Sequence, residues 1–168
     1  MTTPGAAAPL AAALRQADDA YAKGDWRTAE QLCARVLTAH AEYFEALNLL
    51  GIICAQTQRS AQAEQLLRRA LAVMPADPVV HNNYGNVLKD LGRLRDAAEN
   101  FLRAIELDPK YSEAYTNRGA VLRALGDRRA AVECYERALA LRPDYAEAHY
   151  DLGVILQETG RVEDSLSC

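Results

Sequence analysis

The sequence predicts an all-α solenoid of antiparallel helix pairs, and three observations predict it. Glycines recur at a fixed step of 34 residues, at Gly51, Gly85, Gly119 and Gly153. Other columns keep the same step in the same register, at Ala63, Ala97 and Ala131, at Ala70, Ala104 and Ala138, at Pro75, Pro109 and Pro143, and at Gly92, Gly126 and Gly160. Between these columns apolar residues recur every three or four positions, which is the period of a helix with one buried face. A repeat of this length and period is typical of stacked helical hairpins.

The pattern of residues within each repeat predicts two helices, and this pattern is clearest in the third repeat. A first helix over 80–91 follows Asp77 and Pro78, because aspartate caps free N–H groups and proline suits the first helical turn. A glycine ends this helix, and a second helix over 94–105 closes before Pro109. The predicted units are 10–43, 44–77, 78–111, 112–145 and a partial unit 146–168, after a flexible N-terminal tail over 1–9.

The first, second and fifth units depart from this pattern. In the first unit Ala17 stands where later units have glycine, and Ala41 stands where they have proline, which is typical of a terminal repeat. In the second unit Gln58 stands in the second glycine column. The fifth unit reaches Cys168 inside its second predicted helix, so the pattern predicts more helix than the sequence contains.

The composition argues against several functional classes. A formal net charge of −4 argues against a nucleic-acid binder, which usually carries a basic excess. No run of about 18 apolar residues is present to span a membrane. The four cysteines form no CxxC pair and match no zinc spacing, which predicts free thiols in a reducing cytoplasm. We also find no metal-ligand set, phosphate loop or catalytic triad, so the sequence predicts no metal, no cofactor and no enzymatic step.

The repeat columns resemble tetratricopeptide repeats. The stretches AEAHYDLGVILQETGR and YTNRGAVLRALGDRRAAVECYERALALRPDY match that family's order of Leu-Gly, Tyr or Leu, Ala, an aromatic residue, Ala and Pro. The resemblance covers nearly the whole chain from about residue 10 onward. It implies a right-handed superhelix in which the first helix of each pair lines a concave groove that binds a partner polypeptide.

The resemblance also implies which residues face that groove. The candidate peptide-binding residues are Asn48, Asn82, Asn83, Asn86, Lys89, Thr116, Asn117, Arg123, Tyr150 and Asp151. An asparagine amide both donates and accepts hydrogen bonds, so a regular row can hold an extended backbone with little regard for its sequence. Such a row resembles the asparagine ladder of O-linked N-acetylglucosamine transferase and SPINDLY-type proteins, although Arg15 and Leu49 interrupt it here. The alternative is that these are solvent-facing polar residues without a partner.

The last unit and the turns suggest two further surfaces. The chain is either a fragment of a longer protein or a complete chain whose open end another copy covers. The candidate self-association residues are Leu152, Ile155, Leu156, Val162 and Leu166. Near the turns inside the helix pairs lie Arg59, Arg93, Arg128, Arg129 and Arg161. These arginines form either a basic edge for an acidic partner or a solvated edge interleaved with acidic residues.

These observations predict a cytoplasmic, non-enzymatic scaffold that binds an extended peptide or a helix of a protein partner in its groove. Two alternatives stay open. The first is that the chain is the substrate-recruiting N-terminal region of a larger glycosyltransferase similar to O-linked N-acetylglucosamine transferase. The second is a homo-oligomeric scaffold that self-assembles through its C-terminal end.

Overall fold

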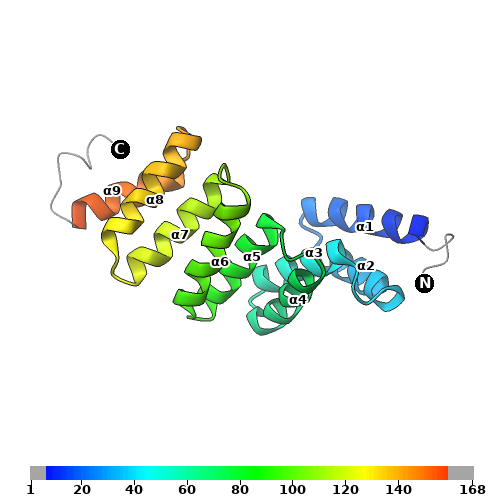
Figure 1. Cartoon of the computed structure of the whole chain (residues 1–168). Helices are drawn as coiled ribbons and strands as arrows, with labels where there is room; N and C mark the ends of the chain where they lie inside the picture. Colours follow the sequence, from blue (N-terminus) through cyan, green and yellow to red (C-terminus); the bar gives the residue numbers. More distant parts are fainter. Residues whose placement is uncertain (1–6, 159–168) are drawn as a thin grey trace. The chain divides into compact units, whose positions relative to one another are not determined.

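The computed structural model describes residues 7–158, and over that range the chain folds into helices joined by short turns. In chain order they are α1 (Ala7–Ala22), α2 (Trp26–Ala39), α3 (Phe44–Gln56), α4 (Ser60–Val73), α5 (Pro78–Asp90), α6 (Leu94–Leu107), α7 (Ser112–Ala124), α8 (Arg128–Leu141) and α9 (Ala146–Glu158) (Figure 1). The chain divides into unit 1, Met1–Ala76, and unit 2, Asp77–Cys168. The predicted all-α repeat fold is therefore confirmed.

The predicted N-terminal tail needs a correction at its last residues. Helix α1 begins at Ala7, inside the range 1–9 that we expected to be flexible. The start is alanine-rich, alanine has the highest helix propensity, and Pro9 is tolerated because it stands in the first turn. Residues 1–6 of that range lie outside the described part of the chain.

The helix pairs begin and end at matching positions because the same local chemistry recurs. Asp25, Asp77 and Asp127 each accept a hydrogen bond from the backbone N–H three residues on, at 3.1, 2.9 and 3.1 Å. After α1, α3, α5 and α7 the chain turns through one residue with positive φ, and the residues at these turns are Gly24, Gln58, Gly92 and Gly126. Gln58 takes a φ of +60° although it has a side chain, which costs about 1–2 kcal/mol. The backbone thus follows the repeat even where the residue type departs from it.

Three of the described hairpins, α3–α4, α5–α6 and α7–α8, close over a position on the first helix that has no side chain. A Cβ atom at Gly85 would lie 2.6 Å from a ring carbon of Phe101, and one at Gly119 would lie 2.8 Å from a ring carbon of Tyr135. Both distances are far below ordinary contact, so glycine is required for the second helix to approach this closely. Phe101 and Tyr135 are buried completely. Gly85 and Gly119 belong to the glycine column that recurs every 34 residues, and the structure identifies an aromatic ring of the second helix as the group that occupies the space they leave.

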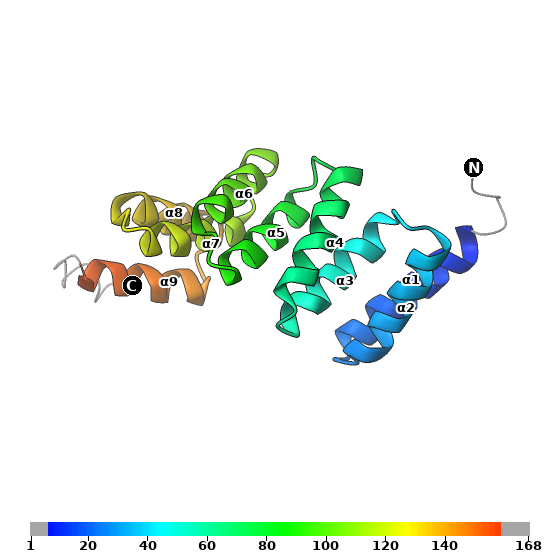
Figure 2. The ribbon, with the colours of Figure 1, turned by 90° about the horizontal axis from the view of Figure 1, so that it is seen from below.

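The helices of unit 2 pack so that the first helices lie on the inner side of a bend. Helix α7 contacts both α5 and α9, and α6 and α8 each pack against the first helix that follows them (Figures 1 and 2). Within the described part of this unit, α6 and α8 do not contact one another. The first helices therefore converge while the second helices spread apart. Among residues 7–158, no helix is both long and apolar enough to cross a membrane.

Replacing Gly119 with leucine should open the α7–α8 hairpin. The new side chain has to displace the buried ring of Tyr135, so we expect the free energy of unfolding to fall by about 1–3 kcal/mol or more. Urea denaturation followed by circular dichroism measures the change. The matched control is Ala124→Leu in the exposed last turn of the same helix, which should change the stability by less than about 0.5 kcal/mol. Equal stability of wild type and Gly119→Leu would contradict the packing argument.

Candidate functional site

The candidate site is a surface formed by the three first helices of unit 2, and it is here called the first-helix face. It consists of the residues at positions 2, 5, 6, 9 and 12 of α5, α7 and α9, which lie on one side of each helix because they are three or four residues apart. Its members are Val79, Asn82, Asn83, Asn86 and Lys89 on α5, Glu113, Thr116, Asn117, Ala120 and Arg123 on α7, and Glu147, Tyr150, Asp151, Val154 and Gln157 on α9. Equivalent positions of neighbouring helices thus lie on one surface of unit 2.

Asn82 is the first correction to the predicted binding residues. Its side chain is 0% exposed, so it cannot meet a partner on the surface. The Asn82 Oδ1 atom accepts a hydrogen bond from Nδ2 of Asn117 at 2.9 Å, and its Nδ2 atom donates to Oε1 of Glu113 at 3.3 Å. Helix α7 therefore covers this amide and satisfies it from two of its own turns. The Asn82 amide links two repeats.

Thr116 and Tyr150 stand in the same repeat column as Asn82 but differ in environment. Thr116 is 1% exposed, and its hydroxyl donates to the carbonyl of Ser112 in its own helix at 3.3 Å. This burial corrects the prediction that Thr116 faces a partner. Tyr150 is 72% exposed and is the most exposed of the large apolar side chains in the described part of the chain. Tyr150 is therefore a side chain that a partner can reach.

The remaining predicted residues are partly exposed. On the first-helix face they are Asn83, Asn86, Lys89, Asn117, Arg123 and Asp151. Asn48 is also half-buried, on α3 of unit 1. That these residues contact a partner stays a prediction.

Asp151 lies at the centre of the charges on this face. Burial raises the pKa of its carboxyl, Arg123 opposes the shift, Glu147 adds to it and Lys89 opposes it. The Tyr135 hydroxyl lies beneath this group, and burial raises its pKa, with the nearby carboxylate of Asp151 adding to the shift. Charged residues of α5, α7 and α9 thus all act on the pKa of the half-buried Asp151 carboxyl.

The sequence reasoning missed two acidic residues of the face. Glu113 and Glu147 are both exposed, at the second position of α7 and α9. The repeat contains the pattern that would have found them, because Glu45, Glu113 and Glu147 share a column. The sequence analysis assigned no role to Tyr135, whose hydroxyl lies near Asp151 and Arg123.

The predicted self-association residues are mostly internal. Leu152, Ile155 and Leu156 are buried and pack in one cluster with Ala131 and Tyr135 of α8. They pack against the preceding hairpin, because they carry the apolar period of α9 on the side that meets α8, so the prediction that these three form an exposed, sticky surface is corrected. Val162 and Leu166 lie outside the described residues.

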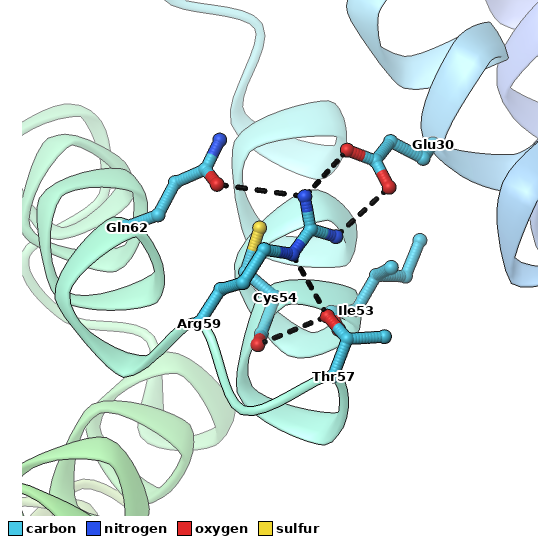
Figure 3. Close-up of polar contacts among 6 residues, drawn as sticks. All are labelled: Glu30, Ile53, Cys54, Thr57, Arg59 and Gln62. Atoms are coloured by element: carbon cyan, nitrogen blue, oxygen red, sulfur yellow. Dashed lines mark hydrogen bonds and ion pairs between the residues drawn. The ribbon is translucent and has the colours of Figure 1, made fainter.

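Several arginines near the turns are engaged within the chain. Figure 3 shows Arg59, at the turn between α3 and α4, pointing its guanidinium at Glu30 of α2. The two groups form a bidentate pair, with Nη1 to Oε1 at 2.7 Å and Nη2 to Oε2 at 2.8 Å. The Arg59 Nε atom also donates to the Thr57 hydroxyl at 3.0 Å. Arg93 and Arg129 pair with acidic residues of the following turn, Asp96 and Glu133. These contacts favour the edge interleaved with acidic residues over a free basic edge.

The described cysteines are suited to packing. Cys33, Cys54 and Cys134 are buried as free thiols, and burial raises the pKa of all three, that of Cys33 to about 12. A thiol with a raised pKa is a weak nucleophile at neutral pH. Within residues 7–158, no cluster of histidine, cysteine or acidic residues has the arrangement to hold a metal ion.

Replacing Asn82 with alanine should weaken the link between α5 and α7. The change leaves the Asn117 amide without the acceptor at 2.9 Å, so we expect a loss of about 1–2 kcal/mol in the free energy of unfolding. Asn86→Ala is the matched control on the same helix, because Asn86 is partly exposed and alanine favours the helix. Thermal and urea unfolding compare the two variants. Equal stabilities would show that the buried amide pair contributes nothing.

The pair of Glu30 and Arg59 predicts a pH-dependent contribution to stability. The hydrogen bond from Arg59 lowers the pKa of Glu30, so the contribution is complete above the ordinary glutamate pKa and is lost as the pH falls through the lowered value. Glu30→Gln should therefore cost about 0.5–1 kcal/mol at pH 7, and this difference should shrink below about pH 4. Urea unfolding at pH 7, 4 and 3 measures it. Glu133→Gln, at an exposed pair within one helix, should cost less at pH 7, and a loss at Glu30 that does not change with pH would contradict the assignment.

Comparison with known proteins identifies the repeats. A family model described as "TPR repeat" matches residues 85–126 and 119–160, and another described as "Tetratricopeptide repeat" matches residues 14–79. No curated protein sequence matches the chain significantly.

Solved structures share the fold. A crystal structure of MamA is 22% identical and superposes with a TM-score of 0.81, covering 90% of this chain and 88% of that one. PilF of Pseudomonas aeruginosa is 21% identical with a TM-score of 0.86, covering 94% of this chain and 72% of that one. A mutant O-GlcNAc transferase of Thermobaculum terrenum is 34% identical with a TM-score of 0.78 over 83% of this chain, which spans 27% of the transferase. Because the family models match well over half of its residues, the chain belongs to the tetratricopeptide-repeat family, whose members are protein-interaction scaffolds.

Proposed function

We propose that the chain binds an extended peptide or a helix of a protein partner on the first-helix face of unit 2. The observation that carries this proposal is the exposure of Tyr150 beside the partly exposed amides of the same face. A tyrosine that is 72% exposed offers a large ring that a partner can cover, with a hydroxyl that can still form a hydrogen bond. Such side chains often dominate protein interfaces.

The amide side chains give this face a way to hold a backbone. Asn83 and Asn86 on α5 and Asn117 on α7 are partly exposed, and each amide offers both a donor and an acceptor. An extended segment presents both groups at every residue, so it can be held by such amides with modest dependence on its sequence. The mechanism is non-covalent, and it combines the bend of the first helices, one aromatic anchor and amide hydrogen bonds.

The proposal is tested by peptide selection on the purified chain. Twelve-residue peptides selected from a random displayed library should lose about tenfold or more in affinity for a Tyr150→Ala/Asn86→Ala variant, measured by fluorescence anisotropy. Asn117 is left unchanged in this variant because it donates to the buried Asn82 at 2.9 Å, and its loss would mix stability with binding.

The matched control changes exposed residues on the second helices of the same unit. Leu102→Ala/Glu136→Ala should leave peptide affinity within about twofold of wild type, because both side chains belong to α6 and α8. Circular dichroism checks that both variants stay helical. Selected peptides that bind the first variant as tightly as wild type, or that lose affinity only for the control variant, would refute binding on this face.

A second candidate function is substrate recruitment in a larger glycosyltransferase. The observation that favours it is the 34% identity to the O-GlcNAc transferase of Thermobaculum terrenum over 83% of this chain. Sequencing the gene beyond codon 168 tests it. A glycosyltransferase domain in the same frame would support this candidate, and a stop codon directly after residue 168 would remove it.

Self-assembly through the C-terminal end, the remaining alternative, has weaker support. Leu152, Ile155 and Leu156 are buried against α8 of the preceding hairpin, so they are not available to a second copy. We therefore assign no function to this surface.

A further inference from the structure

The first-helix face of unit 2 carries charges of opposite sign at its two ends. Glu113 and Glu147 occupy the second position of α7 and α9, whereas Lys89 and Arg123 occupy the twelfth position of α5 and α7. Ten residues of helix separate the two positions, which is about 15 Å along the axis. The face therefore has an acidic flank and a basic flank, with the amides between them.

Helix-dipole compensation alone does not account for this arrangement. Acidic residues at the start and basic residues at the end stabilise any helix, so the same bias would be expected in the second helices. Yet α2, α4 and α8 have no acidic residue in the first turn, and none of α2, α4, α6 and α8 has a basic residue in the last turn. In α6 the one acidic first-turn residue, Asp96, pairs with Arg93. The charge separation within unit 2 thus belongs to the first helices.

The acidic flank is oriented by neutral groups. Glu113 accepts from the Asn82 amide at 3.3 Å, and Glu147 accepts from the Tyr145 hydroxyl at 3.3 Å. Both contacts fix the position of a carboxylate without neutralising it. Tyr150 lies three residues after Glu147 on the same side of α9, where its ring can cover a cation that pairs with Glu147. An exposed ring beside an exposed carboxylate is suited to a lysine or arginine side chain.

The two flanks stand at opposite ends of the first helices and on different pairs of helices. Glu113 and Glu147 lie in the first turn of α7 and α9, and Lys89 and Arg123 lie in the last turn of α5 and α7. Lys89 lies on α5 and Glu147 on α9, so the two flanks are also staggered along the unit. The basic flank covers α5 and α7, and the acidic flank covers α7 and α9.

Building on the function proposed above, we propose that the first-helix face binds an extended segment whose acidic and basic side chains project to opposite sides. Acidic side chains of the segment pair with Lys89 and Arg123, and basic side chains pair with Glu113 and Glu147. Successive residues of an extended chain point in opposite directions, so alternation of charge along the sequence produces these two sides. The amides between the flanks hold the backbone, and the stagger places acidic residues of the segment nearer α5 and basic residues nearer α9.

Two peptides of identical composition test the proposal. In a labelled twelve-residue peptide of alternating Glu and Lys, each side of the extended chain has one sign of charge. In its partner, made of alternating Glu-Glu and Lys-Lys pairs, each side has both signs. Both peptides have the same net charge, so any difference in affinity reports the arrangement. We expect the alternating peptide to bind wild type about tenfold more tightly at low salt, with the preference reduced in 0.5 M NaCl.

Two variants place the preference on the named residues. Glu113→Gln/Glu147→Gln should reduce it to about twofold or less, and glutamine at 113 can still accept from Asn82, so folding is kept. The matched control, Glu133→Gln/Glu136→Gln on the exposed side of α8, should retain the preference.

Each other outcome contradicts the proposal. Equal binding of the two peptides to wild type, or a preference that survives Glu113→Gln/Glu147→Gln, would overturn the charged flanks while leaving the binding face intact. If neither peptide binds but peptides selected from the random library do, the charge inference also falls and the proposed function stands. If no peptide of any kind binds wild type, both fall.

Discussion

The fold depends on a close contact between a first-helix position that has no side chain, or only a methyl group, and a buried side chain on the second helix. In unit 2 this is the contact of Gly85 with Phe101 and of Gly119 with Tyr135, and in unit 1 it is the contact of Gly51 with Leu67. The first hairpin has different residues at the two equivalent positions. Ala17 takes the glycine position there, and the position of the large side chain holds the small Cys33, both fully buried. The repeat thus conserves the space between two helices more strictly than the residue types.

This packing rule also connects the core to the candidate site. Since Tyr135 passes beneath α7 where Gly119 leaves room, its hydroxyl comes close to Arg123 and Asp151. A phenylalanine, as at position 101, would fill the same space without bringing a polar group there. Burial raises the pKa of this hydroxyl, and the charged groups of Asp151 and Arg123 act on it from the first helices. The α7–α8 hairpin therefore places a polar group beneath the first-helix face, whereas the α5–α6 hairpin has a phenylalanine at the equivalent position.

The sequence predicted the elements well because their ends are set by local chemistry. Capping aspartates, positive-φ turn positions and prolines act within a few residues, so a 34-residue period reports them directly. The environment of Asn82 was not predictable in the same way. Its burial depends on α7, whose Glu113 and Asn117 lie 31 and 35 residues further along the chain. Gln58 shows the opposite case, because its backbone takes the positive φ of the glycines in its column although its residue type departs from them.

The column of Asn82, Thr116 and Tyr150 shows why a repeated position need not have a repeated role. Asn82 is satisfied by the next first helix, Thr116 by its own helix, and Tyr150 is left largely exposed. In the neighbouring column of Asn83, Asn117 and Asp151, the Asn117 amide donates to Asn82, so part of its hydrogen-bonding capacity is used between repeats. Recognition by amides alone would be weakly selective, whereas charges fixed at the two ends of the same helices discriminate between segments by arrangement. The chain can thus combine a tolerant grip on a backbone with a preference for particular side chains.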